Sequence, residues 1–266
     1  MLDHARFRRL ALAHWAERRR EYGAFLGVVV ALHAVLVTIY LATDKGFVQL
    51  SLAEQSSLYW IGLLLTAPVF AARHFLPLSH RDAGPSLLLR PASNLEKLLL
   101  ALLVVLVLYP LAYSLLFHLC NVPAALLAEG RAAEAWAKLA PEARERSGGL
   151  DPTLYGLQLP GAGREWRDDA EAWATLGLFL LWTLFGTLRF RRSPMVKTFV
   201  AGFAVFLLIT LVSEWSGGSP DRLFAFLQPR DTLEAWKKWV LLSGWIVVPA
   251  LSLWACYLAL CERESA

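Results

Sequence analysis

Long apolar stretches alternate with shorter charged segments along most of this 266-residue chain. An α-helix needs about 20 mainly apolar residues to cross the core of a bilayer. Six stretches come close to that length: Ala24 to Ala42, Leu58 to Leu76, Leu98 to Cys120, Ala172 to Phe190, Val196 to Ser213 and Trp239 to Cys261. In lipid a helix satisfies its own backbone, whereas an open strand does not. The pattern therefore predicts an all-α membrane protein with six transmembrane helices in one domain, residues 1–266.

The segment before the first span, residues 1–22, reads "MLDHARFRRLALAHWAERRREY" and mixes six arginines with apolar residues. Phe7 and Trp15 belong to a partly helical apolar spacing that would place an apolar stripe beside a cationic one. We predict an interfacial helix here, and membrane lipids as its partner. The alternative is a solvated basic leader that only sets the topology. The first span is followed by "TDKGF" without a small-residue cleavage site, so we expect it to be retained.

Charge predicts the orientation of the spans. If both termini are cytoplasmic, the inner segments carry 15 of the 26 Lys and Arg residues, although they are the shorter part of the sequence outside the spans. This is the bias of the positive-inside rule, and the short turn from Arg189 to Lys197 shows it most clearly. The net charge of +4 is then an orientation signal, and we expect no nucleic-acid partner. The balance of 57% hydrophobic and 18% charged residues excludes an average soluble domain.

The same orientation places two longer connections on the outer face. Residues 121–171 join the third and fourth spans; helix formers come first and turn residues follow, which predicts a helix and then an irregular segment. The first three spans thus lie within residues 24–120 and the last three within 172–261. Between the fifth and sixth spans, Leu223 to Leu227 forms an apolar cluster too short to cross, which suits an interfacial or re-entrant helix.

Side chains that could carry chemistry are scarce in the spans. His33 and His118 are lone histidines, which a neighbouring helix or interfacial water more often satisfies than a function employs. The three cysteines show no metal-ligand or disulfide spacing, and no phosphate-binding G-x-x-x-x-G-K-[ST] pattern occurs. We therefore predict no catalytic, cofactor-binding or metal site and no enzyme activity in this chain. Pro68, Pro110 and Pro249 predict kinks within or beside spans.

The connection between the second and third spans, Arg73 to Lys97, has the most distinctive pattern. Ser93 is a suitable N-cap for the helix that becomes the third span, and Glu96 follows three residues later. A serine and a glutamate at this spacing form a capping box, in which each side chain accepts a hydrogen bond from the other residue's backbone N–H. We predict that the charged segment contains the first turn of the membrane helix.

This connection resembles the one found in ABC-2 type permeases, the membrane subunits of a class of ABC exporters. The family pattern is an acid-glycine turn, a leucine-rich stretch, and then Pro-x-Ser and an acid before the third span. The residues here that look like this pattern, or lie within it, are Arg81, Asp82, Gly84, Leu87, Leu88, Leu89, Arg90, Pro91, Ser93 and Glu96. The chain departs from the pattern at Gly84-Pro85, where Gly-Thr is usual, and in its large outer loop.

The resemblance implies a permease subunit in the bacterial inner membrane. The connection would be a coupling helix that docks into a separate ABC ATPase, which would bind ATP and magnesium, and a second permease chain would complete a dimer. Arg81 and Arg90 could contact acidic groups of the ATPase or lipid headgroups. The runner-up hypothesis is a non-transporting membrane scaffold or regulatory subunit, and a membrane-embedded enzyme comes third. The substrate, the direction of transport, the choice between homodimer and heterodimer, and the role of residues 121–171 stay open.

Overall fold

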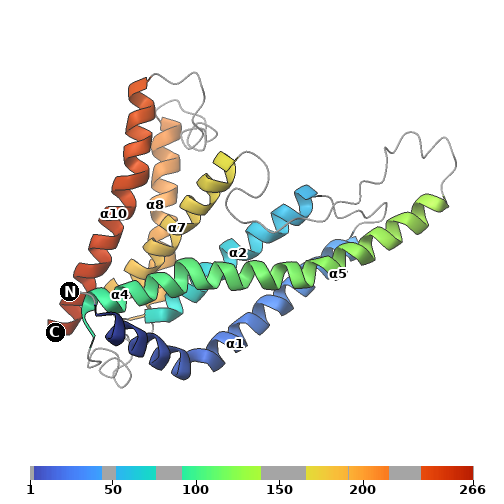
Figure 1. Cartoon of the computed structure of the whole chain (residues 1–266). Helices are drawn as coiled ribbons and strands as arrows, with labels where there is room; N and C mark the ends of the chain where they lie inside the picture. Colours follow the sequence, from blue (N-terminus) through green and yellow to red (C-terminus); the bar gives the residue numbers. More distant parts are fainter. Residues whose placement is uncertain are drawn as a thin grey trace. The chain divides into compact units, whose positions relative to one another are not determined.

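The computed structural model describes residues 3–43, 52–75, 92–138, 166–190, 192–215 and 235–265. All regular structure in these ranges is helical (Figure 1). The elements are α1 (His4–Thr43), α2 (Leu52–Phe75), α4 (Asn94–Leu102), the π-helix η2 (Leu103–Leu108), α5 (Tyr109–Ala137), α7 (Trp166–Arg189), α8 (Pro194–Trp215) and α10 (Ala235–Ser265). Over its described residues, each predicted span is helical apart from Phe190 at the end of the fourth. The all-α prediction is therefore confirmed for this part of the chain.

Among the described residues, four helical segments are long and apolar enough to cross a membrane: His4–Ile39, Gln55–Phe75, Asn94–Glu134 and Ala172–Arg189. They cover nearly all of the first four predicted spans. The last two predicted spans lie in α8 and α10, whose apolar stretches are the shorter Pro194–Val205 and Val247–Glu262. The length and composition of these four helices therefore indicate a multi-pass membrane protein.

Two helices continue past the segment boundaries predicted from the sequence. The predicted N-terminal helix and the first predicted span lie in one continuous helix, α1, which runs from His4 to Thr43 (Figure 1). Beyond the third predicted span, α5 continues through Pro123 to Ala137. The helix predicted in the outer loop is the continuation of the third span, as its alanine-rich sequence allows.

A π-helical turn, η2, separates α4 from α5 and ends two residues before Pro110. Proline lacks the backbone N–H that would bond to Leu106, and its ring clashes with that carbonyl in a regular helix. A wider turn is a known way to relieve such a conflict. The predicted irregularity at Pro110 is thus a local change of helix type. Pro68 and Pro249 lie inside α2 and α10.

The chain divides into two compact units. Unit 1 comprises Met1–Leu10, Pro68–Leu106 and Arg167–Ala266, and unit 2 comprises Ala11–Ala67 and Val107–Trp166. In unit 1, α4 packs against α10. The helices α7 and α8 approach each other so closely that a Cβ at Gly186 would overlap the side chain of Thr198.

Candidate functional site

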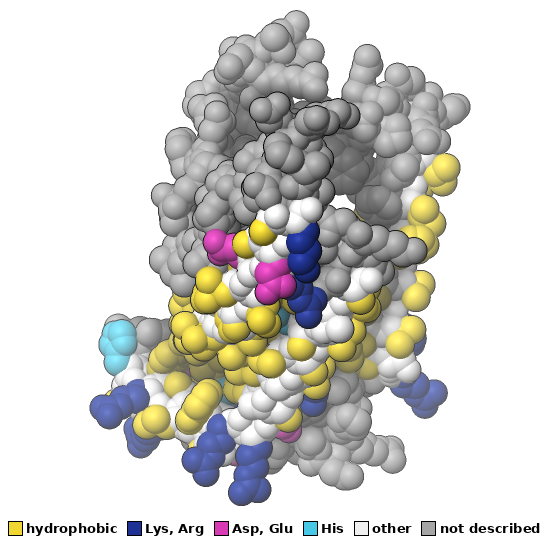
Figure 2. Space-filling view, turned by 90° about the vertical axis from the view of Figure 1, so that its right-hand side faces the viewer, with side chains coloured by type: hydrophobic (Ala, Val, Ile, Leu, Met, Phe, Trp, Pro, Cys, Tyr) yellow, Lys and Arg dark blue, Asp and Glu magenta, His cyan; other side chains and the backbone are white. Residues whose placement is uncertain are grey.

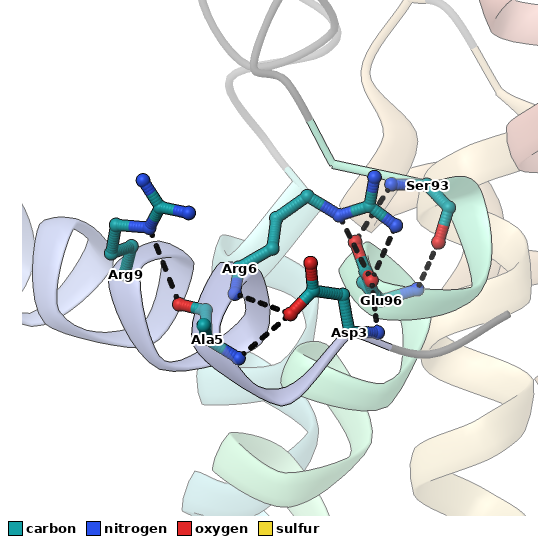
Figure 3. Close-up of polar contacts among 6 residues, drawn as sticks. All are labelled: Asp3, Ala5, Arg6, Arg9, Ser93 and Glu96. Carbon is teal, nitrogen blue, oxygen red and sulfur yellow. Dashed lines mark hydrogen bonds and ion pairs between the residues drawn. The ribbon is translucent and has the colours of Figure 1, made fainter.

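The start of α1 is tied to the start of α4 by a cluster of polar side chains in unit 1. We call this cluster, formed by Asp3, Arg6, Ser93 and Glu96, the N-terminal clasp (Figure 3). Its two halves lie far apart in the sequence, since Arg6 and Glu96 are separated by 90 residues. Two of its members, Ser93 and Glu96, belong to the connection between the second and third predicted spans, which makes the clasp the candidate site.

Glu96 is the centre of the clasp. Its Oε1 accepts hydrogen bonds from Arg6 Nη2 at 2.7 Å, from Arg6 Nε at 3.1 Å and from the backbone N–H of Asp3 at 3.2 Å. Its Oε2 accepts the backbone N–H of Ser93 at 2.9 Å. Both carboxylate oxygens are therefore engaged, and Arg6 presents two nitrogens to one of them. Such charge-assisted bonds also fix the orientation of the two groups.

The clasp caps two helices at once. Ser93 Oγ accepts the backbone N–H of Glu96 at 3.3 Å, which completes the predicted capping box at the start of α4. Asp3 Oδ1 accepts the backbone N–H groups of Ala5 at 2.9 Å and Arg6 at 3.3 Å at the start of α1. Each helix start carries a partial positive charge, and a nearby carboxylate offsets it. Two such starts can lie together here because each has its own acid.

Burial makes the pairing of Glu96 necessary. Its side chain is 0% exposed, whereas that of Arg6 is 38% exposed. A carboxylate without water is strongly unfavourable unless protein groups replace the hydration. Arg6 and the backbone N–H groups of Asp3 and Ser93 do so here, and Arg6 keeps part of its own contact with solvent. The clasp thus consists of a buried carboxylate, Glu96, and a partly exposed guanidinium, Arg6, that pairs with it.

Other polar contacts in unit 1 join helix ends. Asn94 Nδ2 donates to Cys261 Sγ at 3.4 Å, which links the start of α4 to the end of α10. Arg189 and Glu262 form an ion pair at 3.5 Å between the ends of α7 and α10, with both side chains largely exposed. Four sequence segments therefore meet through named contacts: the N-terminus, the start of α4, the end of α7 and the end of α10.

The structure describes only part of the predicted coupling site. Ser93 and Glu96 are described, and the capping box predicted for them is confirmed. Arg81, Asp82, Gly84, Leu88, Arg90 and Pro91 lie outside the described residues. Sequence reasoning missed Arg6, which it counted only as one of several N-terminal arginines. The one available signal was the unusual position of an acid, Glu96, at the edge of a basic segment.

The first half of α1 presents a mixed cationic and apolar surface. Leu12 and Trp15 are both 58% exposed, and the arginines Arg8, Arg9, Arg19 and Arg20 are exposed as well. Figure 2 shows Lys and Arg side chains interspersed with hydrophobic ones along the lower edge of that face. This composition suits a boundary between acyl chains and anionic headgroups.

Groups that could hold a metal do not gather in the described part of the chain. Within it, no cluster of three or more His, Cys, Asp or Glu side chains could bind a metal ion. The thiols of Cys120, Cys256 and Cys261 are all free. What the described residues assemble is a set of structural contacts at helix ends and between helices.

Comparison of the chain with protein-family models, with curated proteins and with solved structures found no match in any of the three. The class of this protein is therefore defined by its own structure. Over its described residues the chain is all-helical, and four of these helices are long and apolar enough to cross a membrane.

Proposed function

We propose that this chain is the membrane permease subunit of an ABC-2-like transporter. It would have six spans with both termini in the cytoplasm, would lie in a bacterial inner membrane, and would pair with a second permease chain. ATP would be hydrolysed by a separate ATPase subunit. The observation that carries the proposal is the capping box at Ser93 and Glu96, where the resemblance to the family predicts the coupling loop to enter the third span.

The helix-end contacts support the proposed orientation. The segments that they join, namely residues 3–6, 93–96, 189 and 261–262, come from four regions that the charge pattern assigns to the inner side or its boundary. A topology that put any one of them on the opposite face would have to break a contact that the folded chain makes. The inner assignment of the connection before α4 agrees with a docking role toward a cytoplasmic ATPase.

The clasp suggests how motion would pass from the loop into the membrane. Closure of the ATPase pair would push on the loop that ends at Ser93. Glu96, one turn further on, is held by Arg6, so the start of α1 would move with the start of α4. A transport cycle needs two states with different affinities for nucleotide or substrate. In this scheme the clasp keeps α1 and α4 together as the first element to respond.

Affinity purification tests the proposal most directly. The tagged chain is extracted from its native host in mild detergent, and co-purifying proteins are identified by mass spectrometry. A stoichiometric ATPase with a Walker motif is the expected result. Recovery of the chain alone, or with partners that lack ATPase motifs, would contradict the permease assignment and favour the scaffold or regulatory subunit.

Stimulation of the purified ATPase then tests the coupling site. Changing Arg81, Asp82, Arg90 and Glu96 together to Ala should abolish stimulation while the helical circular dichroism signal persists. Arg6→Gln should weaken stimulation, whereas Arg9→Gln should not, because the Arg9 side chain bonds to Ala5 of its own helix. Normal stimulation in the fourfold variant would overturn the assignment of this loop.

A further inference from the structure

Unit 2 contains a row of aromatic and polar side chains where α1, α2 and α5 meet. Along α5 they recur at every fourth residue, and α2 and α1 supply the facing side chains. We call this row the aromatic seam; its members are Phe25, His33, Gln55, Tyr59, Thr66, Tyr109, Tyr113, Ser114, Phe117 and Asn121. All are buried. Ring contacts join them across helices, such as Phe117 with Tyr59 at 5.1 Å and with His33 at 4.8 Å.

The hydroxyl groups of the seam are all paired. Tyr59 and Ser114 share a hydrogen bond of 2.7 Å. The Tyr113 hydroxyl donates to the backbone carbonyl of Tyr59 at 2.9 Å. The Tyr109 hydroxyl donates to Thr66 Oγ1 at 2.6 Å. Gly62 makes room for this arrangement, since a Cβ at that position would overlap the Tyr113 hydroxyl.

Two buried polar atoms of the seam have no hydrogen-bond partner among the described residues. Asn121 donates through Nδ2 to Gln55 Oε1 at 2.8 Å, but within the described part its Oδ1 is unpaired, and so is Nε2 of His33. Asn121 is 1% exposed and His33 is 8% exposed. Phe117 packs on the His33 ring, and Asn121 follows Phe117 on α5 by about one helical turn. An unpaired buried group costs free energy, so two of them in one seam call for a missing partner.

The chemistry of the two atoms defines that partner. Asn121 Oδ1 can only accept, so it needs a donor; His33 Nε2 accepts or donates according to tautomer. A phosphate or carboxylate group offers no proton to Asn121. A cation would meet no acidic side chain among the described residues of the seam, and an unpaired buried charge is strongly unfavourable. A neutral O–H group fits, because it can donate to Asn121 and also bond to His33.

We propose that the aromatic seam binds a small neutral molecule through an O–H group placed between His33 Nε2 and Asn121 Oδ1. The O–H belongs either to an ordered water or to the hydroxyl of a bound organic molecule. Buried waters of this kind make about three hydrogen bonds to otherwise unpaired polar groups. This site is independent of the proposed transport function, since it depends only on the packing of unit 2.

Hydroxyl-radical footprinting of the full-length protein in lipid nanodiscs tests the site. Radiolysis of a bound water oxidises the side chains next to it, even when they are buried, and H₂¹⁸O identifies water as the oxygen source. We expect oxidation of Phe117, which is 3% exposed, with ¹⁸O incorporated. Phe25, which is 8% exposed and packs on Tyr109 away from the unpaired atoms, is the matched control and should stay unmodified.

A second measurement distinguishes the two sources. If Phe117 is protected, denatured protein is extracted and searched by mass spectrometry for a stoichiometric hydroxylated molecule. Such a molecule, lost from His33→Phe and from Asn121→Leu, would assign the O–H to an organic ligand. Labelling of Phe117 in the wild-type protein would assign it to water. Protection of Phe117 together with an empty extract would overturn the proposal, whether or not the variants fold.

Discussion

The N-terminal clasp of unit 1 and the aromatic seam of unit 2 are held by different kinds of contact. The clasp joins helix starts through a carboxylate and a guanidinium 2.7 Å apart. The seam joins helices along their length through neutral groups, with hydroxyl and amide hydrogen bonds of 2.6 to 2.9 Å. Both link distant parts of the sequence, and each contains fully buried polar side chains, Glu96 in the clasp and Gln55 in the seam. They differ in whether the contact depends on charge.

The difference follows from where water is available. A charged side chain at the depth of a bilayer is costly, whereas one at a helix end can keep part of its hydration. Arg6 does so, being 38% exposed. Neutral hydrogen bonds carry a smaller desolvation cost, so they can occupy the middle of a helix bundle. The charged contacts between helices described above accordingly lie at helix ends, and the neutral contacts of the seam lie along α1, α2 and α5.

The largest change in stability is expected where neither kind of contact is involved. In unit 1, Gly186→Ala would place a Cβ against the branched side chain of Thr198, which cannot move away easily. Overpacking of this kind costs about 1–3 kcal/mol. Thermal unfolding in detergent should show a clear fall in Tm. If Gly186→Ala melted at the wild-type temperature, the close approach of α7 and α8 would be wrong.

Gly177→Ala is the matched control for that experiment. Gly177 lies on the same helix as Gly186, and apart from its chain neighbours and the adjoining backbone of its own helix, no atom of the described residues comes within 4 Å of the position that an alanine Cβ would take there. Alanine is favoured over glycine in a helix by roughly 0.5–1 kcal/mol, so this variant should match or exceed the wild-type Tm.

Removal of the clasp charge should have the next largest effect. Glu96→Gln keeps a side chain of similar shape but removes the anion that holds Arg6 and offsets both helix starts. We expect a lower Tm, and we expect Arg6→Gln to add little in the double variant, because the two changes break the same contact. Arg9→Gln serves as the control. Fully additive losses from Glu96→Gln and Arg6→Gln would show that the pair is not coupled.

A smaller effect is expected in the aromatic seam. Tyr59→Phe removes the hydroxyl bonded to Ser114, which still donates to the carbonyl of Pro110. Hydrogen bonds between membrane helices average about 0.6 kcal/mol. The fall in Tm should therefore be slight and should not change with salt concentration, in contrast to the clasp. Ser252→Ala, which removes a bond within one helix, is the reference. If Tyr59→Phe lowered the Tm more than Glu96→Gln did, the seam and not the clasp would make the larger contribution to stability.

The smallest effect is expected at the ion pair of Arg189 and Glu262. Its side chains are 64% and 70% exposed, and its nitrogen and oxygen are 3.5 Å apart. Exposed pairs contribute about 0–1 kcal/mol and are screened by salt. Arg189→Ala should leave the Tm nearly unchanged at moderate ionic strength. A large loss would mean that this pair, and not the clasp, holds the helix ends of unit 1 together.

Several features could be predicted from the sequence because they depend on local patterns. Apolar length predicted helices where α1, α2, α7, α8 and α10 occur. The spacing of Ser93 and Glu96 predicted the cap of α4, since both partners lie within one turn. Boundaries were harder. The alanine-rich residues beyond Cys120 continue the helix of the third predicted span, and α5 accommodates Pro123.

The sequence by itself determined the membrane character, the helical class and the cap of α4, because hydropathy and short-range hydrogen bonding are properties of neighbouring residues. Only the tertiary structure decided which of the N-terminal arginines meets Glu96 and which polar atoms of the seam lack a partner among the described residues. Arg6, Arg8 and Arg9 are alike in sequence, and only the approach of α1 to α4 distinguishes Arg6. The contacts of His33 and Asn121 likewise depend on helix packing, which no local pattern encodes.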